Sequence, residues 1–456
     1  MSYNAGVQQA GVYIHIPFCE RKCTYCNFNT TDYFDGLAAR YVDAVKDEIA
    51  WWGRNAAGDE NARCGTANHR NQIDTIYFGG GTPSLIEADQ IASLLEASRN
   101  AFCVSPDAEV TIEINPATLA RPKLEAWLTA GVNRASVGVQ SFIDSELVSL
   151  SRTHNSDAAR RTIDQLREAG FDNISLDLIA GLPEQTLKDW ESNLREALEL
   201  RPEHLSLYLL EVKEGTRLFS QIKRGQRAAP DDDLAAEMYR LMCESARAAG
   251  YEQYEISNFA LLRQAAGEDA PAGSAGVPPA STGQTTLGKT CGRDAGAPGS
   301  VPPASTGQTT LGETWGRDAG APRSLRSKHN LKYWTGAAFY GMGCGAHSYD
   351  GRARWMNILK TEDYIEQVGL RGHATAERRE LSAEERASDA LFMGLRLSEG
   401  IDLEEFRAEY EVDVLERYAG EFPELFDARL IELNDGRLML TEAGRLMSNE
   451  VFVHFV

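Results

Sequence analysis

Three closely spaced cysteines are the strongest chemical signal in the sequence. Cys19, Cys23 and Cys26 follow a CxxxCxxC spacing within the stretch HIPFCERKCTYCNF. In a cytosolic chain, clustered cysteines indicate a metal or redox site before they indicate disulfides. An Fe–S cube usually takes four protein thiolates, one for each iron, so three thiolates leave one iron with an open coordination position.

An open iron position is useful only when a second molecule binds there. S-adenosylmethionine can do so because it supplies an amine and a carboxylate, and electron transfer into its sulfonium would cleave a C–S bond and start radical chemistry. The alternative is a zinc site with His15 or a remote cysteine as the fourth ligand. Zinc sites of this kind typically pair two knuckles, and the sequence has no second CxxC. The spacing therefore favours the cluster.

The elements that must position this loop alternate along the chain. Apolar, β-rich runs are followed by amphipathic segments, and six such pairs predict a parallel sheet with right-handed crossovers. The expected strands are residues 11–16, 73–78, 108–114, 134–139, 173–180 and 204–212, and the expected helices are 35–52, 86–102, 120–130, 154–169, 186–199 and 232–249. A full barrel needs eight units and only six are clear, so we predict an α/β fold with a partial (β/α)6 barrel.

Glycine-rich and polar residues follow these strands, where the loops of parallel α/β folds build their sites. In GGGTPS, the glycines at 79–81 let the backbone approach a ligand closely, and their N–H groups can meet a carboxylate. Glu113, Gln140, Arg152 and Asp177 stand at or beyond later strand ends. Asp177 alternates with leucines and can face the barrel interior, where a carboxylate needs a partner. Taken one at a time, these residues fit an ordinary turn or a surface carboxylate equally well.

A duplicated segment divides the chain. The stretch at 277–298 returns with two changes at 301–322, and its Gly, Pro, Ser and Thr content cannot bury enough apolar area to offset the entropy of ordering. We predict a disordered insertion over 263–326, with no role for its Cys291. The barrel would take 1–262, a segment at 327–379 would complete the core, and 380–456 would form a small helical, winged-helix-like C-terminal domain with a short NDG hairpin.

Charge and hydropathy exclude several classes of function. The chain of 456 residues has a net charge of −21, which argues against general binding to nucleic-acid phosphates. It contains no apolar run of about 18 residues that would predict a transmembrane helix. Its first residues lack the basic and apolar parts of a secretory signal. We therefore expect a cytoplasmic protein without nucleic-acid partners.

Together the motifs resemble those of radical S-adenosylmethionine proteins, and more narrowly the HemW-type haem chaperones and the related oxygen-independent coproporphyrinogen III oxidases. The resemblance covers nearly the whole chain apart from 263–326, and it rests on YIHIPFCERKCTYCNF, YFGGGTPS, EINP, GVNRASVGVQSF, SRTH, DLIAGLP, YEISNFA and HNLKYW. It implies one [4Fe–4S] cluster on the three cysteines. The S-adenosylmethionine contacts that it implies are Tyr13, Gly80, Gly81, Thr82, Glu113, Gln140, Arg152 and Asp177. Tyr25, next to Cys26, can pack against cluster or cofactor, or simply into the core.

HNLKYW, at residues 329–334, is the second stretch of chemical interest. His329 offers an imidazole, a common axial ligand of haem iron, and Tyr333 and Trp334 offer flat faces to a macrocycle. A histidine beside aromatic residues is by itself more often structural, but the resemblance links HNxxYW to haem binding. Because the predicted insertion ends just before it, we expect the site on an exposed edge. Cys344 and His347 are candidates for a second site, with packing favoured.

Two departures separate the sequence from the oxidases. They carry a further cysteine where this chain has Phe28, and a longer segment before the first strand. The sequence therefore predicts a haem chaperone that passes haem to an acceptor haemoprotein, for instance a respiratory one. The alternatives are oxidative decarboxylation of coproporphyrinogen III and another radical reaction, such as a methyl transfer. A homodimer, a peripheral contact with membrane proteins and cleavage of S-adenosylmethionine stay open.

Overall fold

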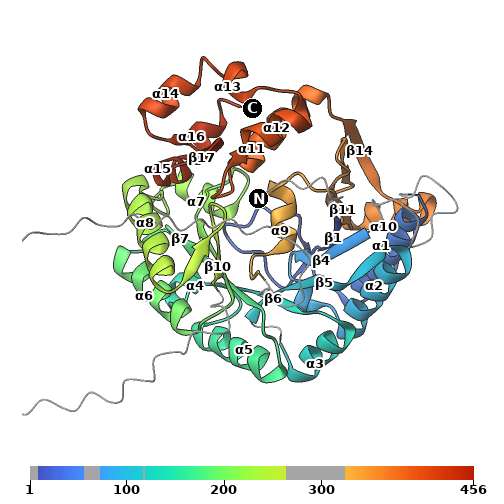
Figure 1. Cartoon of the computed structure of the whole chain (residues 1–456). Coiled ribbons are helices and arrows are strands. Elements are labelled where there is room, and N and C mark those ends of the chain that lie inside the picture. Colours follow the sequence, from blue (N-terminus) through green and yellow to red (C-terminus); the bar gives the residue numbers. More distant parts are fainter. Residues whose placement is uncertain (1–8, 56–71, 117–118, 263–323, 456) are drawn as a thin grey trace, which may run out of the picture. The chain divides into compact units, whose positions relative to one another are not determined.

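A run of parallel strands forms the centre of the main sheet (Figure 1). The computed structural model describes residues 9–55, 72–116, 119–262 and 324–455. The six predicted strands are present, and each pairs in parallel with the next. They are β1 (Ala10–Ile16), β4 (Gln72–Gly80), β5 (Cys103–Ile114), β6 (Arg134–Gln140), β7 (Ile174–Ala180) and β8 (His204–Leu209).

Both edges of this parallel group are extended by strands that the sequence analysis did not predict. On the β1 side lies β11 (Phe339–Met342), parallel to β1, and then the antiparallel strands β12 (His347–Tyr349), β13 (Ala353–Asn357) and β14 (Thr375–Glu380). On the β8 side, β10 (Asn258–Leu261) and β9 (Tyr251–Gln253) are antiparallel. Among the described strands, β14 and β9 end the sheet and do not pair with each other. The barrel is therefore open, and the predicted partial architecture is confirmed.

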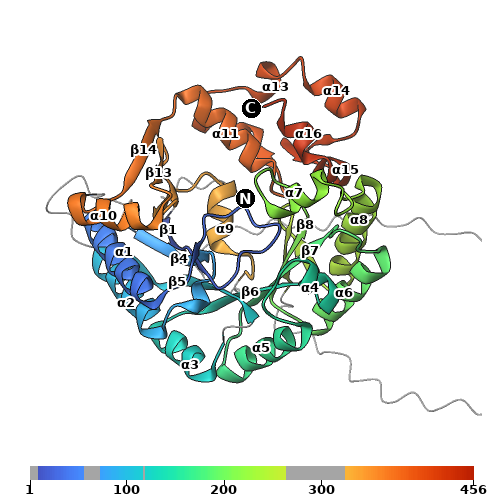
Figure 2. The same ribbon diagram turned by 180° about the vertical axis from the view of Figure 1, so that it is seen from behind.

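The predicted helices form a layer outside this sheet (Figure 2). They are α1 (Asp35–Asn55), α2 (Ala88–Ala101), α3 (Arg121–Ala130), α5 (Ser156–Ala169), α6 (Leu187–Glu199) and α8 (Asp232–Ala248). Local sequence sets their ends: the Asn155 side chain accepts from the N–H of Ala158 at the start of α5, and Gly170 ends α5 at φ 106°. The short helices α4 (Asp144–Ser149) and α7 (Arg217–Lys223) were not predicted.

Side chains alternate between the two faces of the parallel strands. On β1, Val12, Ile14 and Ile16 are fully buried in the core under the helices. The opposite face, which the barrel encloses, carries mostly polar residues: Tyr13, His15, Thr75, Tyr77, Thr111, Glu113, Arg134, Ser136, Ser175, Asp177, His204 and Ser206. A barrel filled by branched apolar side chains would be a closed core. This polar interior can instead receive a charged ligand.

The segment after the predicted insertion returns to the barrel. Residues 263–323 lie outside the described part of the chain, so the predicted disorder of these residues stays a prediction. The last three residues of that predicted range are ordered: Leu325 is buried, and Arg326 pairs with Glu252 of β9. Helix α9 (Lys328–Trp334) follows, and Figures 1 and 2 both show it at the centre of the barrel. Helix α10 (Thr361–Arg371) then packs against α1.

The C-terminal residues form a helical unit with its own apolar core. Its helices are α11 (Ala383–Gly394), α12 (Leu403–Tyr410), α13 (Val414–Arg417), α14 (Phe422–Asp427), α15 (Glu442–Leu446) and α16 (Ser448–Phe452). Its small sheet joins β15 (Ile401–Asp402), β17 (Arg437–Leu440) and β16 (Ile431–Asn434). The predicted hairpin is present between β16 and β17, with Asp435 and Gly436 at φ 48° and 78°. In the described part of the chain, no helix is long and apolar enough to cross a membrane.

Substitution of two leucines tests the packing of the C-terminal core. Leu391 on α11 is fully buried in it, whereas Leu433 on β16 is 48% exposed. We expect Leu391→Ala to lower the free energy of unfolding by about 2–5 kcal/mol, because it leaves a cavity, and Leu433→Ala to lower it by less than about 0.5 kcal/mol. Urea denaturation of both variants measures this difference. Equal losses would contradict the packing described for this core.

Candidate functional site

The cysteine loop begins where β1 ends and is held at several points. Its two short strands, β2 (Phe18–Cys19) and β3 (Thr31–Asp32), pair with each other. At its middle, the N–H of Thr24 donates to the carbonyl of Leu150 (3.0 Å), and the N–H of Leu218 on α7 donates to the carbonyl of Thr24 (2.8 Å). Figure 2 shows the loop beside α7. The loop thus lies at the end of the barrel formed by the C-terminal ends of the strands.

The three predicted cysteines are half-buried and near one another. The Sγ of Cys19 lies 3.7 Å from the Oγ1 of Thr82, and the Sγ of Cys23 accepts a hydrogen bond from Nη1 of Arg152 (3.5 Å). Burial raises the pKa of Cys19 to about 11, and the nearby thiols of Cys26 and Cys23 raise it further. Burial likewise raises the pKa of Cys26. The Cys19 and Cys26 thiols therefore stay protonated at neutral pH until a cation displaces the protons.

The arrangement fits a cluster better than a zinc ion. In the described part of the chain, no three His, Cys, Asp or Glu side chains converge as a single metal ion requires. A cube instead spreads three thiolates over three irons. His15, the alternative fourth zinc ligand, has both ring nitrogens engaged, with Nδ1 at 3.1 Å from Tyr13 Oη and Nε2 at 2.9 Å from the carbonyl of Asn29.

The glycine turn after β4 fits closely under the cysteine loop. Gly80 has a φ of +118°, and a Cβ at Gly81 would stand 2.7 Å from the carbonyl oxygens of Pro17 and Phe18. The sequence predicted that the N–H groups of residues 79–81 can meet a carboxylate of a ligand, but those of Gly80 and Gly81 have partners within the chain. The N–H of Gly80 donates to Glu113 Oε2 (3.1 Å), and that of Gly81 donates to the carbonyl of Ile16 (2.8 Å). The glycines therefore serve close approach of the backbone rather than an open anion site.

Two predicted carboxylates lie in the barrel interior. Glu113 accepts from the hydroxyl of Tyr77 (2.9 Å) as well as from Gly80, and burial raises its pKa to about 7, with a further increase from the nearby Asp177. Asp177 accepts from Ser136 Oγ (3.1 Å), and burial raises its pKa too. Two half-buried carboxyl groups that interact in this way favour a positively charged ligand between them.

Arg152 links the cysteine loop to the strand ends. Its Nη2 donates to the carbonyl of Gly138 (2.7 Å), its Nη1 reaches Cys23, and its buried Nε has no protein partner among the described residues. Gln140, the last residue of β6, has a φ of +67°, a strained backbone of the kind that occurs at functional sites. Tyr25 packs beside Leu150 and its neighbours, so part of its role is ordinary packing.

Two residues that were not predicted lie next to Arg152. Asn115 Oδ1 lies 3.5 Å from Nη2 of Arg152 and 3.2 Å from Nδ1 of His154. Burial and the Arg152 charge lower the pKa of His154 to about 4. Both residues stand in quoted motifs, EINP and SRTH, and the motif positions were the available signal. They position the guanidinium beside the cysteines.

The histidine of HNLKYW does not lie on an exposed edge, so that expectation was wrong. His329 is 1% exposed, with Nδ1 at 2.8 Å from Thr75 Oγ1 and Nε2 at 3.0 Å from Tyr333 Oη. Burial lowers its pKa to about 3, so the imidazole is neutral. The cause is the return of α9 into the barrel, where Lys332 pairs with Asp74 at the start of β4. Helix α9 therefore closes the end opposite the cysteine loop.

Tyr333 and Trp334 are less enclosed than His329. Both are half-buried, and the guanidinium of Arg396, which follows α11, lies 4.4 Å from the centre of the Trp334 ring. The face of α9 that carries them therefore meets the C-terminal unit. Of the second-site candidates, Cys344 is fully buried and accepts from Tyr41 Oη (3.6 Å), and His347 stands exposed on β12. The two show no shared site.

Stacked rings connect the two ends of the barrel. His329 stacks on Tyr77 with ring centres 5.1 Å apart, and Tyr77 donates to Glu113. Tyr13 stacks on both rings, at 6.1 Å from Tyr77 and 6.3 Å from His329. Its hydroxyl reaches His15, which in turn bonds to the cysteine loop. The predicted haem motif and the predicted cofactor residues therefore belong to one packed interior.

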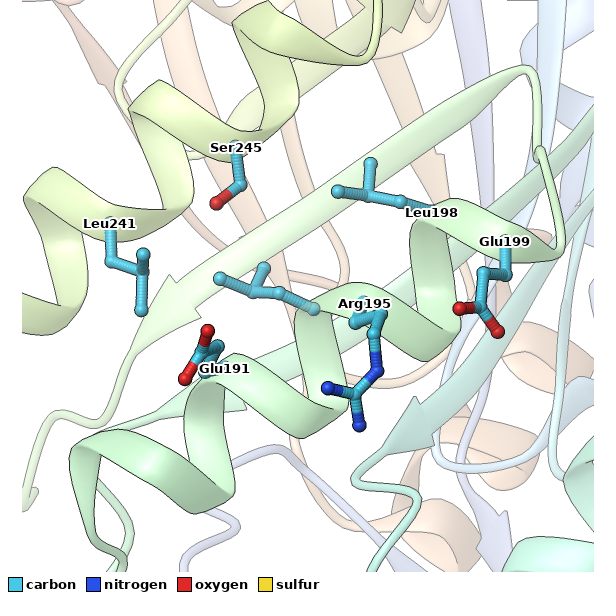
Figure 3. Close-up of a pocket in the computed structure, with 7 residues that line it drawn as sticks. Glu191, Arg195, Leu198, Glu199, Leu241 and Ser245 are labelled. Atoms are coloured by element: carbon cyan, nitrogen blue, oxygen red, sulfur yellow. The ribbon is translucent and has the colours of Figure 1, made fainter. Parts of the chain in front are cut away.

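A groove on the outer helices is separate from these residues. It measures about 420 Å³ and lies between α6 and α8 (Figure 3). Its lining consists of Glu191, Leu194, Arg195, Leu198, Glu199, Leu241 and Ser245. None of the predicted site residues contributes to it.

Comparisons with known proteins agree with this geometry. Residues 13–197 match the radical SAM superfamily model, and residues 381–447 match the HemN C-terminal domain model. The haem chaperone HemW of Bacillus subtilis is 31% identical over 97% of this chain and 98% of its own. The mitochondrial radical S-adenosyl methionine domain-containing protein 1 of Bos taurus is 33% identical over 87% of this chain and 75% of its own.

A solved structure supports the fold independently. The coproporphyrinogen III oxidase HemN of Escherichia coli, described as a radical SAM enzyme, superposes with a TM-score of 0.72. The match covers 98% of this chain and 90% of that one at 20% identity. At this identity, the likeness concerns the fold alone.

The raised pKa of Glu113 has a consequence for stability. Because the folded-state pKa of about 7 lies above the unfolded value, stability from this group is present at low pH and is lost as the pH rises toward 7. Between pH 4.5 and 7.5, we expect the free energy of unfolding of the wild type to fall by about 1–3 kcal/mol more than that of Glu113→Gln. Urea denaturation across this range tests it, with the exposed Glu96→Gln as the control. An unchanged slope in Glu113→Gln would contradict the assignment.

Proposed function

The chain belongs to the HemW family of radical S-adenosylmethionine proteins, and on that premise we propose that it is a haem chaperone. It binds haem and transfers it to an acceptor haemoprotein. It carries one [4Fe–4S] cluster, held by Cys19, Cys23 and Cys26, and an exchangeable S-adenosylmethionine. The observation that supports this most strongly is the set of three adjacent thiols at the end of β1, beside Arg152 and the glycine turn.

The residues around the cysteine loop suit the cluster and its cofactor. The thiolates formed on iron binding would be negatively charged, and the Arg152 guanidinium already contacts one of these sulfurs. S-adenosylmethionine, when bound, supplies a sulfonium that can be cleaved to a radical. Glu113 and Asp177 would balance its positive charges, while Gly80 and Gly81 allow its close approach. Tyr13, Tyr25, Thr82 and Gln140 complete the proposed lining.

Haem would bind at the opposite end, against α9. Tyr333 and Trp334 offer half-buried aromatic faces there, and flat aromatic faces suit stacking with a macrocycle. His329 is enclosed and bonded through both nitrogens. It would ligate the iron only after α9 has moved away from Thr75. The closed arrangement would then be the resting state of the chaperone.

Decarboxylation of coproporphyrinogen remains the less favoured function. The extra cysteine expected of those oxidases is replaced by Phe28, whose side chain is 61% exposed. An exposed phenylalanine supplies no ligand to a cluster.

Substitution of single cysteines tests the proposed cluster. After anaerobic reconstitution, the wild-type chain should hold one [4Fe–4S] cluster, and Cys23→Ala should lose it because one iron has no ligand. Cys344→Ala is the control, since that thiol is buried elsewhere. Iron and sulfide content, with the electron paramagnetic resonance of the reduced protein, provides the readout. A cluster of unchanged type and stoichiometry in Cys23→Ala would contradict the proposal.

Two substitutions separate ligation by His329 from a packing role. His329→Ala should weaken haem binding about tenfold or more and shift the Soret band, because the ligand is lost. Thr75→Val removes the partner of Nδ1 but keeps the imidazole, so it should bind haem at least as tightly as the wild type. Absorbance titration measures both variants. If both lose stability and neither changes the spectrum, His329 is a packing residue only.

A further inference from the structure

Basic residues gather beside the cysteine loop of an otherwise acidic chain. Residues 217–227, RLFSQIKRGQR, contain four basic residues and no acidic residue, and residues 20–28 of the loop contain two basic residues and one acidic residue. We call these six side chains the basic rim: Arg21, Lys22, Arg217, Lys223, Arg224 and Arg227. The whole chain has a net charge of −21, so a local excess of positive charge needs an explanation.

Hydrogen bonds join the two segments of the basic rim. The N–H of Leu218 on α7 donates to the carbonyl of Thr24 in the loop (2.8 Å). Thr24 Oγ1 donates to the carbonyl of Ser149 (3.5 Å), and Arg227 donates to the hydroxyl of the same serine (2.5 Å). The loop, the end of α4 and the stretch after α7 therefore meet at one place, and Figure 2 shows α7 next to the loop.

The charges of the basic rim are not neutralised within the chain. Five of its six side chains are exposed, and Arg227 is half-exposed. None of the six forms an ion pair with a residue in the described ranges, whereas basic residues elsewhere, such as Arg326 and Arg354, do. Two acidic residues lie between β8 and α7: Glu211 is paired with Lys213, and Glu214 forms no ion pair within the described ranges.

We propose that the basic rim is the docking surface for a small acidic one-electron carrier protein, of the flavin or iron–sulfur type. The inference rests on the proposed cluster. One electron passes from the reduced carrier to the [4Fe–4S]2+ cluster, which becomes [4Fe–4S]+, and the carrier is oxidised by one electron. No atom is transferred. Complementary charge brings the carrier to the cysteines and orients it there.

The position of the basic rim favours a carrier over other anionic partners. It borders the loop that holds the cysteines, whereas the predicted haem motif lies at the opposite end of the barrel. Haem carries two carboxylates, so two basic side chains would be enough to neutralise it, whereas the basic rim has six. Electron-transfer complexes typically use small, weakly held interfaces, and an exposed charged rim suits such an encounter.

Neutralisation of three rim charges provides the test. The variant Arg217→Gln, Lys223→Gln, Arg224→Gln removes charge without touching Lys22 or Arg227, which hold hydrogen bonds to Phe28 and Ser149. The matched control is Arg161→Gln, Arg240→Gln, Arg247→Gln, three exposed positions on α5 and α8. The probe is an acidic flavodoxin. Its dissociation constant for each full-length protein is measured at low and high salt, and its rate of cluster reduction is measured by stopped flow.

The rim variant should bind the flavodoxin about tenfold more weakly at low salt, with a flatter salt dependence, because exposed charge pairs contribute modestly and additively. The control should match the wild type, and neutral photoreduced deazariboflavin should reduce all three clusters at one rate. Unchanged flavodoxin binding by the rim variant, or no binding by the wild type, would overturn the proposal. Weaker haem binding by the rim variant, with flavodoxin binding unchanged, would also overturn the proposal, because the basic rim would then bind the propionates of haem. Failure of the wild type to bind haem would count against the chaperone function alone.

Discussion

The interior of this barrel depends on one half-buried carboxyl group. Glu113 accepts from the N–H of Gly80, which fixes the turn beneath the cysteines, and from the hydroxyl of Tyr77, whose ring stacks on His329. A buried carboxyl group without such donors would be costly. Its two hydrogen bonds therefore join the cysteine end and the α9 end of the barrel through a single side chain. A ligand that competes for Glu113 at one end would alter the support of the other.

The barrel wall is open at one side. Since β14 and β9 do not pair within the described sheet, the wall is incomplete, and α9 fills the end near the strand starts. The polar side chains of the strands then lie between α9 and the cysteine loop. The chain, a member of the HemW family, thus presents different side chains at the two ends of its barrel.

The sequence predicted the parts of this structure that depend on local pattern. The six parallel strands, their helices and the NDG hairpin follow from apolar periodicity and turn residues, and the cysteine loop follows from its spacing. The sequence could not predict the place of α9, because its burial depends on contacts with Glu109 and Thr75 across more than two hundred residues. The engaged N–H groups of Gly80 and Gly81 were missed for the same reason: their partners come from other strands.

The most direct measurement of the central claim is a comparison of two haem transfer rates. The haem-loaded, cluster-reconstituted chain is mixed with the apo form of a respiratory haemoprotein, and separately with excess apomyoglobin, which reports spontaneous haem release. A chaperone that hands haem over by contact should transfer it to the respiratory protein faster than it releases it to apomyoglobin, and the rate should rise with acceptor concentration. Equal rates, independent of acceptor concentration, would mean passive release and would contradict the account.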